Sequence, residues 1–127
     1  MQENQLFEYA VIRIVPKVER EEFLNVGVIL YCGKQKFLQV KFHWDSKRIS
    51  LLCPDLDMDE LAGHLKAIER ICQGTPEAGP IGTLPIAERF RWLTATRSTI
   101  LQPSKVHPGF CRNAGEELQK LFEQMVL

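Results

Sequence analysis

The sequence predicts an α+β domain, in which a small antiparallel sheet is covered on one face by about three helices. Residues 6–44 are rich in strand-forming side chains and contain two short connections, which is typical of a three-stranded antiparallel meander. Residues 46–127 show mainly helical periodicity, with a fourth strand expected near residues 98–102. The length of 127 residues suits a single domain spanning residues 1–127.

Each of the three N-terminal strands has its own signature. Residues 7–15 are rich in β-branched and aromatic side chains, and Pro16 ends the strand because proline cannot donate to the hydrogen-bond ladder. Residues 23–32 are almost continuously apolar, which is typical of a central strand covered on both faces. Apolar and polar side chains alternate in residues 37–44, as expected of a half-exposed strand.

The helical region begins directly after these strands. Residues 46–52 are expected to form one short helical turn. Asp57 and Glu60 have the form of a capping box, which opens an amphipathic helix that extends through Cys72. Gly74 is the expected terminator of this helix, because glycine readily adopts the left-handed conformation found at helix ends.

The last third of the chain combines helix, strand and loop. Pro85 suits the first turn of a helix whose apolar side chains recur with helical spacing. The fourth strand is expected at residues 98–102, and residues 103–110 are expected to form a loop because they contain two prolines and a glycine. Asn113 and Glu116 cap a final helix.

The charge pattern restricts the classes of partner. The 16 basic and 16 acidic side chains cancel, so no overall field draws the chain to nucleic acid or to a membrane. No apolar run reaches the roughly 18 residues of a membrane-spanning helix, and the polar first residues do not resemble a signal peptide, so we expect a cytoplasmic protein. Residues 82–110 carry four basic side chains against one acidic, which favours either local pairing or contact with a phosphate or acidic surface.

The four cysteines and three histidines are scattered along the sequence. There is no Cys-x-x-Cys pair and no histidine at zinc-finger spacing, so the sequence predicts neither a metal site nor a cofactor. Because the sequence shows no export signal, we expect the cysteines to be reduced thiols in or near the core.

The most polar stretch is residues 94–107, which combines hydroxyl, guanidinium, amide, ammonium and imidazole groups. Arg97 offers a fork of donors suited to a carboxylate or phosphate, and the adjacent Ser98 and Thr99 could complete an anion cradle. The alternative is structural, with these side chains satisfying helix ends and turns within the fold. The sequence leaves both interpretations open.

A second candidate site lies on the sheet. Asn25 and Gly27 are expected to share one face of the second strand, and Gly27 is expected to mark a bulge or a close approach by another backbone. Antiparallel pairing could bring Arg13 of the first strand near Asn25. A charged side chain among apolar neighbours is costly to bury without a partner, and the structural alternative is an ion pair between Arg13 and Glu21 or Glu22.

The candidate binding residues all have hydrogen-bonding side chains: Arg13, Asn25, Arg89, Arg97, Ser98, Thr99, Gln102 and His107. A shared ligand site requires residues 13–27 and 97–107 to meet in space. Catalysis has weaker support, because His107 could pair with Ser104 or Cys111 but neither has a recognisable nucleophile motif. Three functions remain open: a non-enzymatic interaction module, a nucleic-acid or nucleotide phosphate-binding protein, and a small enzyme using His107 as general base.

Several segments together resemble a bacterial family known as domain of unknown function 3037. They are YAVIR at residues 9–13, EFLNVGVIL at 22–30, GTPEAGPIG at 74–82, ERFRWLTA at 88–95, and RST, QPS and HPG within 97–109. The resemblance covers nearly the whole chain and is weaker in the last helix.

This resemblance implies an interaction role and no particular reaction. The family has no established activity, cofactor or catalytic residues. Its members often resemble small neighbours of a kinase-like protein similar to the toxin kinase HipA, which implies a partner or regulatory subunit. We therefore expect a non-enzymatic interaction or regulatory module that acts with a HipA-like kinase partner through the polar and basic residues above.

Overall fold

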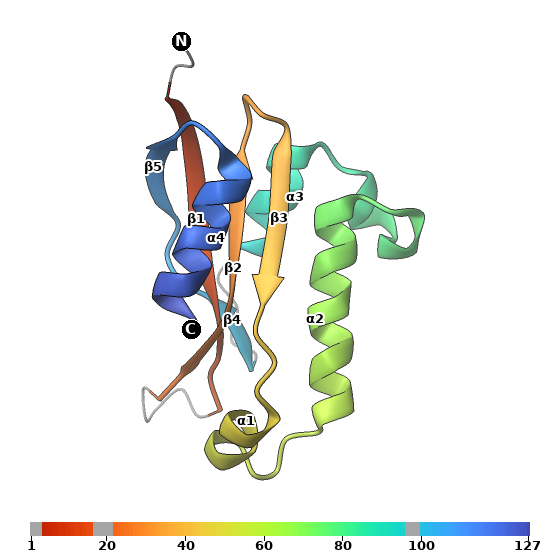
Figure 1. The fold of residues 1–127 in the computed structure, drawn as a ribbon. Helices are drawn as coiled ribbons and strands as arrows, with labels where there is room; N and C mark the ends of the chain where they lie inside the picture. The colour runs from red at the N-terminus through yellow and green to blue at the C-terminus, as the bar shows by residue number, and fades with distance from the viewer. Residues whose placement is uncertain (1–3, 17–21, 96–99) are drawn as a thin grey trace.

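The computed structural model describes residues 4–16, 22–95 and 100–127 (Figure 1). Its elements are, in order, β1 (Gln5–Ile14), β2 (Leu24–Cys32), β3 (Phe37–Phe42), α1 (Ser46–Leu52), α2 (Met58–Gln73), the short 3-10 helices η2 (Pro76–Ala78) and η3 (Pro80–Thr83), α3 (Ile86–Leu93), β4 (Leu101–Pro103), β5 (His107–Cys111) and α4 (Ala114–Met125). The α+β class expected from the sequence is confirmed.

The strands form one antiparallel sheet in the order β3-β2-β1-β4, and β5 also pairs with β1. The meander β1-β2-β3 was expected, and so was a fourth strand, which was placed at residues 98–102 and lies at Leu101–Pro103. The fifth strand was not, because the sequence at Pro108 and Gly109 is typical of a turn. Pro108 of β5 lies opposite Glu8 of β1, and among the described strands β5 pairs with β1 alone. Proline is tolerated at such an edge because its missing N–H can face away from the ladder.

Helices cover both faces of the sheet, so the expectation of helices on one face was wrong. One buried cluster lies between the sheet and α1, α2 and α3; it includes Ala10, Ile12, Ile14, Ile29, Ile49, Leu61, Ile71, Phe90 and Leu93. The other lies between the sheet and α4; it includes Phe7, Val28, Leu30, Cys32, Leu118, Leu121 and Phe122. The nearly continuous apolar sequence of β2 explains why helices lie on both faces of the sheet, because both faces of this strand must be covered.

The helix ends follow the local sequence. The side chain of Asp57 accepts hydrogen bonds from the backbone N–H groups of Asp59 and Glu60, at 3.0 and 3.1 Å, at the start of α2. Gly74 ends α2 in the left-handed conformation, with φ of 70°. Asn113 caps α4 through a side-chain oxygen in the same way as Asp57 caps α2. These three predicted helix signals are confirmed.

A β-bulge changes the alternation of side chains in β2. Ile12 pairs with Gly27, but the next residue of β1, Arg13, pairs with Asn25, so Val26 has no partner across the ladder. Consecutive residues of β1 face opposite sides of the sheet. Asn25 and Gly27 therefore lie on opposite faces, and the prediction that they share one was wrong because the bulge adds one residue between them.

Gly27 also marks a close approach, as its position in the strand predicted. A Cβ atom added there would lie 2.7 Å from the backbone oxygen of Lys41 and 2.5 Å from the Phe42 ring, both on β3. Only glycine fits this contact without a shift of the neighbouring strand.

The four cysteines are unpaired and buried. Burial raises the pKa of the Cys72 thiol to about 12, an effect that the nearby Arg89 guanidinium partly offsets. Burial, together with the Cys32 thiol, raises the pKa of Cys111 to about 11. In the described part of the chain, no helix is long and apolar enough to span a membrane.

Candidate functional site

The sheet brings three of the candidate binding residues side by side. Arg13 of β1 pairs with Asn25 of β2 on one side and with Gln102 of β4 on the other. Directly paired residues on neighbouring strands place their side chains on the same face of a sheet. We call Arg13, Asn25 and Gln102 the polar row. The two distant stretches of sequence thus meet at Arg13, as a shared site requires.

The polar row lies on the face of the sheet that α4 covers. Arg13 is six positions after Phe7 on β1, so both side chains face the same side of the sheet, and Phe7 belongs to the α4-side cluster. The side-chain amide of Asn25 donates to the backbone oxygen of Met125, at 3.0 Å. This hydrogen bond ties β2 to the C-terminal end of α4 and places the polar row just beyond the end of that helix.

The guanidinium of Arg13 lies over an aromatic ring. Its central carbon is 4.3 Å from the centroid of Phe23, a cation–π contact, and Phe23 is 50% exposed. One of the two expected carboxylate partners, Glu21, lies outside the described residues. The ring of Phe23 therefore supports the guanidinium from one side and stands at the surface, where an incoming group can reach it.

Two polar atoms of the row have no hydrogen-bond partner among the described residues. They are Arg13 Nε, a donor, and Asn25 Oδ1, an acceptor, and both are buried. The orientation of the Asn25 amide follows from Met125, because only the nitrogen of the amide can donate to a carbonyl oxygen. Leaving such a group unsatisfied costs about 1–3 kcal/mol, so these two atoms are candidates for a hydrogen bond to a ligand or to water.

Arg89 has a structural position and does not belong to the polar row. Its Nε donates to the backbone oxygen of Leu84 at 3.0 Å, and its Nη1 donates to those of Ile71 and Cys72 at 2.9 Å each. Arg89 therefore joins the last turn of α2 to the segment before α3. Its Nε and Nη1 groups are used inside the fold, which assigns Arg89 a structural role outside the polar row.

His107 lies on the same face as the polar row but further along the sheet. His107 pairs with Tyr9 of β1, which lies four residues before Arg13. The imidazole is exposed, and the centroid of its ring is 5.3 Å from the centroid of the Tyr9 ring. The remaining candidates, residues 97–99, lie outside the described residues.

The groups that could pair with His107 in catalysis are engaged elsewhere. The hydroxyl of Ser104 accepts from the backbone N–H of Val11 and donates to the backbone oxygen of Lys105, both at 2.9 Å. Cys111 is buried, and its raised pKa disfavours the thiolate that a nucleophile requires. The structure thus offers His107 no evident nucleophile in the described part of the chain.

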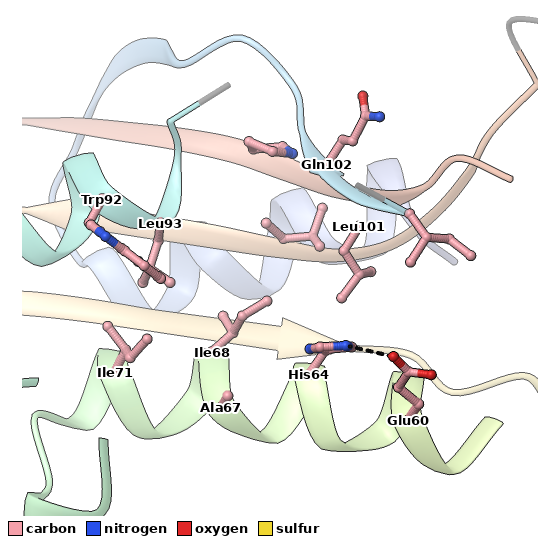
Figure 2. Close-up of a pocket in the computed structure, with 12 residues that line it drawn as sticks. Glu60, His64, Ala67, Ile68, Ile71, Trp92, Leu93, Leu101 and Gln102 are labelled. Atoms are coloured by element: carbon pink, nitrogen blue, oxygen red, sulfur yellow. Dashed lines mark ion pairs between the residues drawn. The ribbon is translucent and has the colours of Figure 1, made fainter. Parts of the chain in front are cut away.

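The opposite face of the sheet carries a hollow that was not expected from the sequence (Figure 2). It lies between α2, α3 and β4 and has a volume of about 440 Å³; its lining residues are Ile12, Glu60, His64, Ala67, Ile68, Ile71, Trp92, Leu93, Ile100, Leu101, Gln102 and Pro103. Figure 2 shows the side chain of Gln102 pointing away from the hollow. This agrees with its pairing to Arg13 on the other face. The sequence contains only the helical spacing of Glu60, His64, Ala67 and Ile71 along one face of α2, and the hollow itself arises from the packing of α2 against α3 and β4.

Comparison with known proteins gives one family. The model of the family described as Protein of unknown function (DUF3037) matches residues 9–126. No curated protein and no solved structure matches the chain.

Proposed function

The chain belongs to the DUF3037 family of proteins of unknown function, and we propose that it is a non-enzymatic interaction module whose polar row binds an anionic group on a partner protein. The observation that carries this proposal is the position of Arg13. Its guanidinium lies against Phe23, on the strand between those that carry Asn25 and Gln102, and its buried Nε has no described partner.

The chemistry of the polar row suits an oxyanion. A guanidinium presents several N–H donors in one plane and binds a carboxylate or a phosphate through two parallel hydrogen bonds. The amides of Asn25 and Gln102 flank it on the neighbouring strands. An amide nitrogen carries two N–H groups, and Asn25 gives one of them to Met125, so the second can donate to an oxygen of the anion, whereas Asn25 Oδ1 accepts and would take an N–H group of the partner.

The partner we propose is a HipA-like kinase, and we place both proteins in the bacterial cytoplasm. The family resemblance supports this choice of partner, and the polar row supplies a chemical reason for it. A kinase complex contains acidic side chains and, after phosphoryl transfer, phosphate groups. Both are oxyanions of the kind that Arg13 can bind.

Nucleic-acid binding has less support from the described residues. Arg89 is engaged by backbone oxygens, and Arg91 lies 3.7 Å from the carboxylate of Glu8. Two of the four basic side chains of residues 82–110 are therefore satisfied within the fold. A phosphate backbone needs several free cations along one surface, because each neutralised phosphate contributes separately to affinity.

Isothermal titration calorimetry tests the polar row. The probes are one short peptide carrying phosphoserine, the same peptide carrying glutamate, and the same peptide carrying unmodified serine. We expect Arg13→Gln to weaken binding of either anionic peptide by about 10- to 100-fold, the range for hydrogen bonds to a charged group. Arg13→Lys should recover only part of that loss, because lysine lacks the planar fork.

Arg91→Gln is the matched control, because it removes one positive charge from an exposed position outside the row. Equal losses for Arg13→Gln and Arg91→Gln would show that only net charge matters and would contradict the proposal. A pull-down with a HipA-like kinase then tests the partner separately. Binding to DNA or RNA that falls steeply with salt, with no binding to either anionic peptide, would favour the nucleic-acid alternative.

A further inference from the structure

We propose that the hollow between α2 and β4 is a second binding site, which takes a small molecule with an elongated apolar body and one cationic amine. It is independent of the polar row, because Ile12 lines the hollow while the neighbouring Arg13 faces the opposite side of the sheet. Gln102 borders both sites, but its side-chain amide points away from the hollow (Figure 2), so a ligand in the hollow would not contact the side chains of the polar row.

The size and walls of the hollow suit a small molecule. Its volume of about 440 Å³ lies within the range of roughly 300–1,000 Å³ that is usual for ligand pockets. The middle of the hollow is apolar, with Ile68 and Ala67 from α2 facing Leu101 of β4, and Ile12 of β1 also belongs to the lining. Apolar walls favour a hydrocarbon or aromatic body over a polar one.

The shape of the hollow is elongated along α2. Figure 2 shows Trp92 and Leu93 at the end near Ile71, while His64 and Glu60 lie at the other end. Residues 60 and 71 of one α-helix are separated by about 16 Å along its axis. An aromatic or aliphatic body at the Trp92 end would thus have room to extend toward Glu60.

The Glu60 end carries the charge that selects the ligand. Glu60 and His64 are the ionisable side chains among the described lining residues, with Nε2 of His64 3.7 Å from a carboxylate oxygen of Glu60. Both side chains are more than half exposed, so the pair can open to admit another group. An ammonium group would complement the Glu60 carboxylate, whereas a carboxylate would be repelled.

Tryptophan fluorescence provides the test. The chain has two tryptophans, so Trp44→Phe leaves Trp92, which lines the hollow, as the only reporter. The probes are 4-phenylbutylamine, 4-phenylbutanol and 5-phenylpentanoate, which share an apolar body and differ in charge. We expect affinity to fall by about threefold from the amine to the alcohol and to fall again for the carboxylate, since an exposed ion pair contributes little more than that.

Two pairs of variants locate the binding. Ala67→Leu should fill the hollow and weaken all three probes at least tenfold, whereas Ala62→Leu, an exposed position on α2 outside the lining, should not change binding. Glu60→Gln should remove the preference for the amine, whereas Glu69→Gln should retain it.

The proposal would be overturned by no response of Trp92 to any probe, by equal affinity for the three probes in the Trp44→Phe protein, or by unchanged binding after Ala67→Leu. Arg13→Gln should bind the amine normally. Loss of amine binding in that variant would mean that the two sites are not independent and would also contradict the proposal.

Discussion

Replacing Arg89 by methionine tests whether this side chain holds the fold together, as its contacts indicate. The substitution keeps a long apolar stem but removes the three hydrogen bonds to Leu84, Ile71 and Cys72. Each hydrogen bond to a charged group contributes about 1.5–3 kcal/mol, but one half-buried guanidinium makes all three, so their effects do not add. We expect the free energy of unfolding to fall by about 3 kcal/mol, which corresponds to about 10 °C in melting temperature.

The assay is urea unfolding followed by circular dichroism, with Arg91→Met as the matched control on the same helix. Arg91 is exposed and its ion pair with Glu8 spans 3.7 Å, so this substitution should cost at most about 0.5 kcal/mol. A loss for Arg89→Met no larger than that for Arg91→Met would refute the structural role of Arg89. It would also reopen Arg89 as a candidate binding residue.

Three further predictions concern stability. Gly27→Ala should destabilise the protein by about 1–3 kcal/mol in urea unfolding because its Cβ would meet β3, whereas Gly63→Ala, in a helix with open space around it, should stabilise it by up to about 1 kcal/mol. The opposite order would contradict the close approach of Gly27 to β3. Ser104→Ala should cost about 1–3 kcal/mol, and hydrogen exchange at the Val11 amide should quicken, because that buried N–H loses its acceptor. Folding raises the pKa of Cys72 from 9.0 to about 12, so the thiol loses its proton at lower pH in the unfolded chain than in the folded one. The free energy of unfolding should therefore fall as pH rises from 9 toward 12. An equally steep fall in Cys72→Ala would assign the effect to other groups.

Local signals in the sequence were enough to predict most of the elements. Asp57 and Gly74 act on their own helix, so their roles can be inferred without knowledge of the rest of the fold. That Arg13 would lie near Asn25 was also predictable, because β1 and β2 are consecutive antiparallel strands, but their direct pairing arises from the bulge. The strand β5 was not predicted because Pro108 is typical of a turn and is compatible with a strand only at the edge of a sheet.

The features that the sequence did not reveal depend on contacts between distant segments. Val26 carries no mark of being the unpaired residue of a bulge, and its insertion reverses the face of Asn25 relative to Gly27. The role of Arg89 depends on where three backbone oxygens lie after α2 and α3 have packed together. The hollow beside Trp92 depends on the space left between α2 and β4, which no local pattern determines.

The most direct test of the central claim is to observe the polar row itself while an anion binds. The Arg13 Nε–H and the Asn25 side-chain amide each give an NMR signal that can be followed during titration with a phosphoserine peptide. We expect both signals to shift in a saturable way, with the Nε–H signal of Arg89, already bonded to Leu84, staying in place. Binding of the peptide with the Arg13 and Asn25 signals unmoved would contradict the claim.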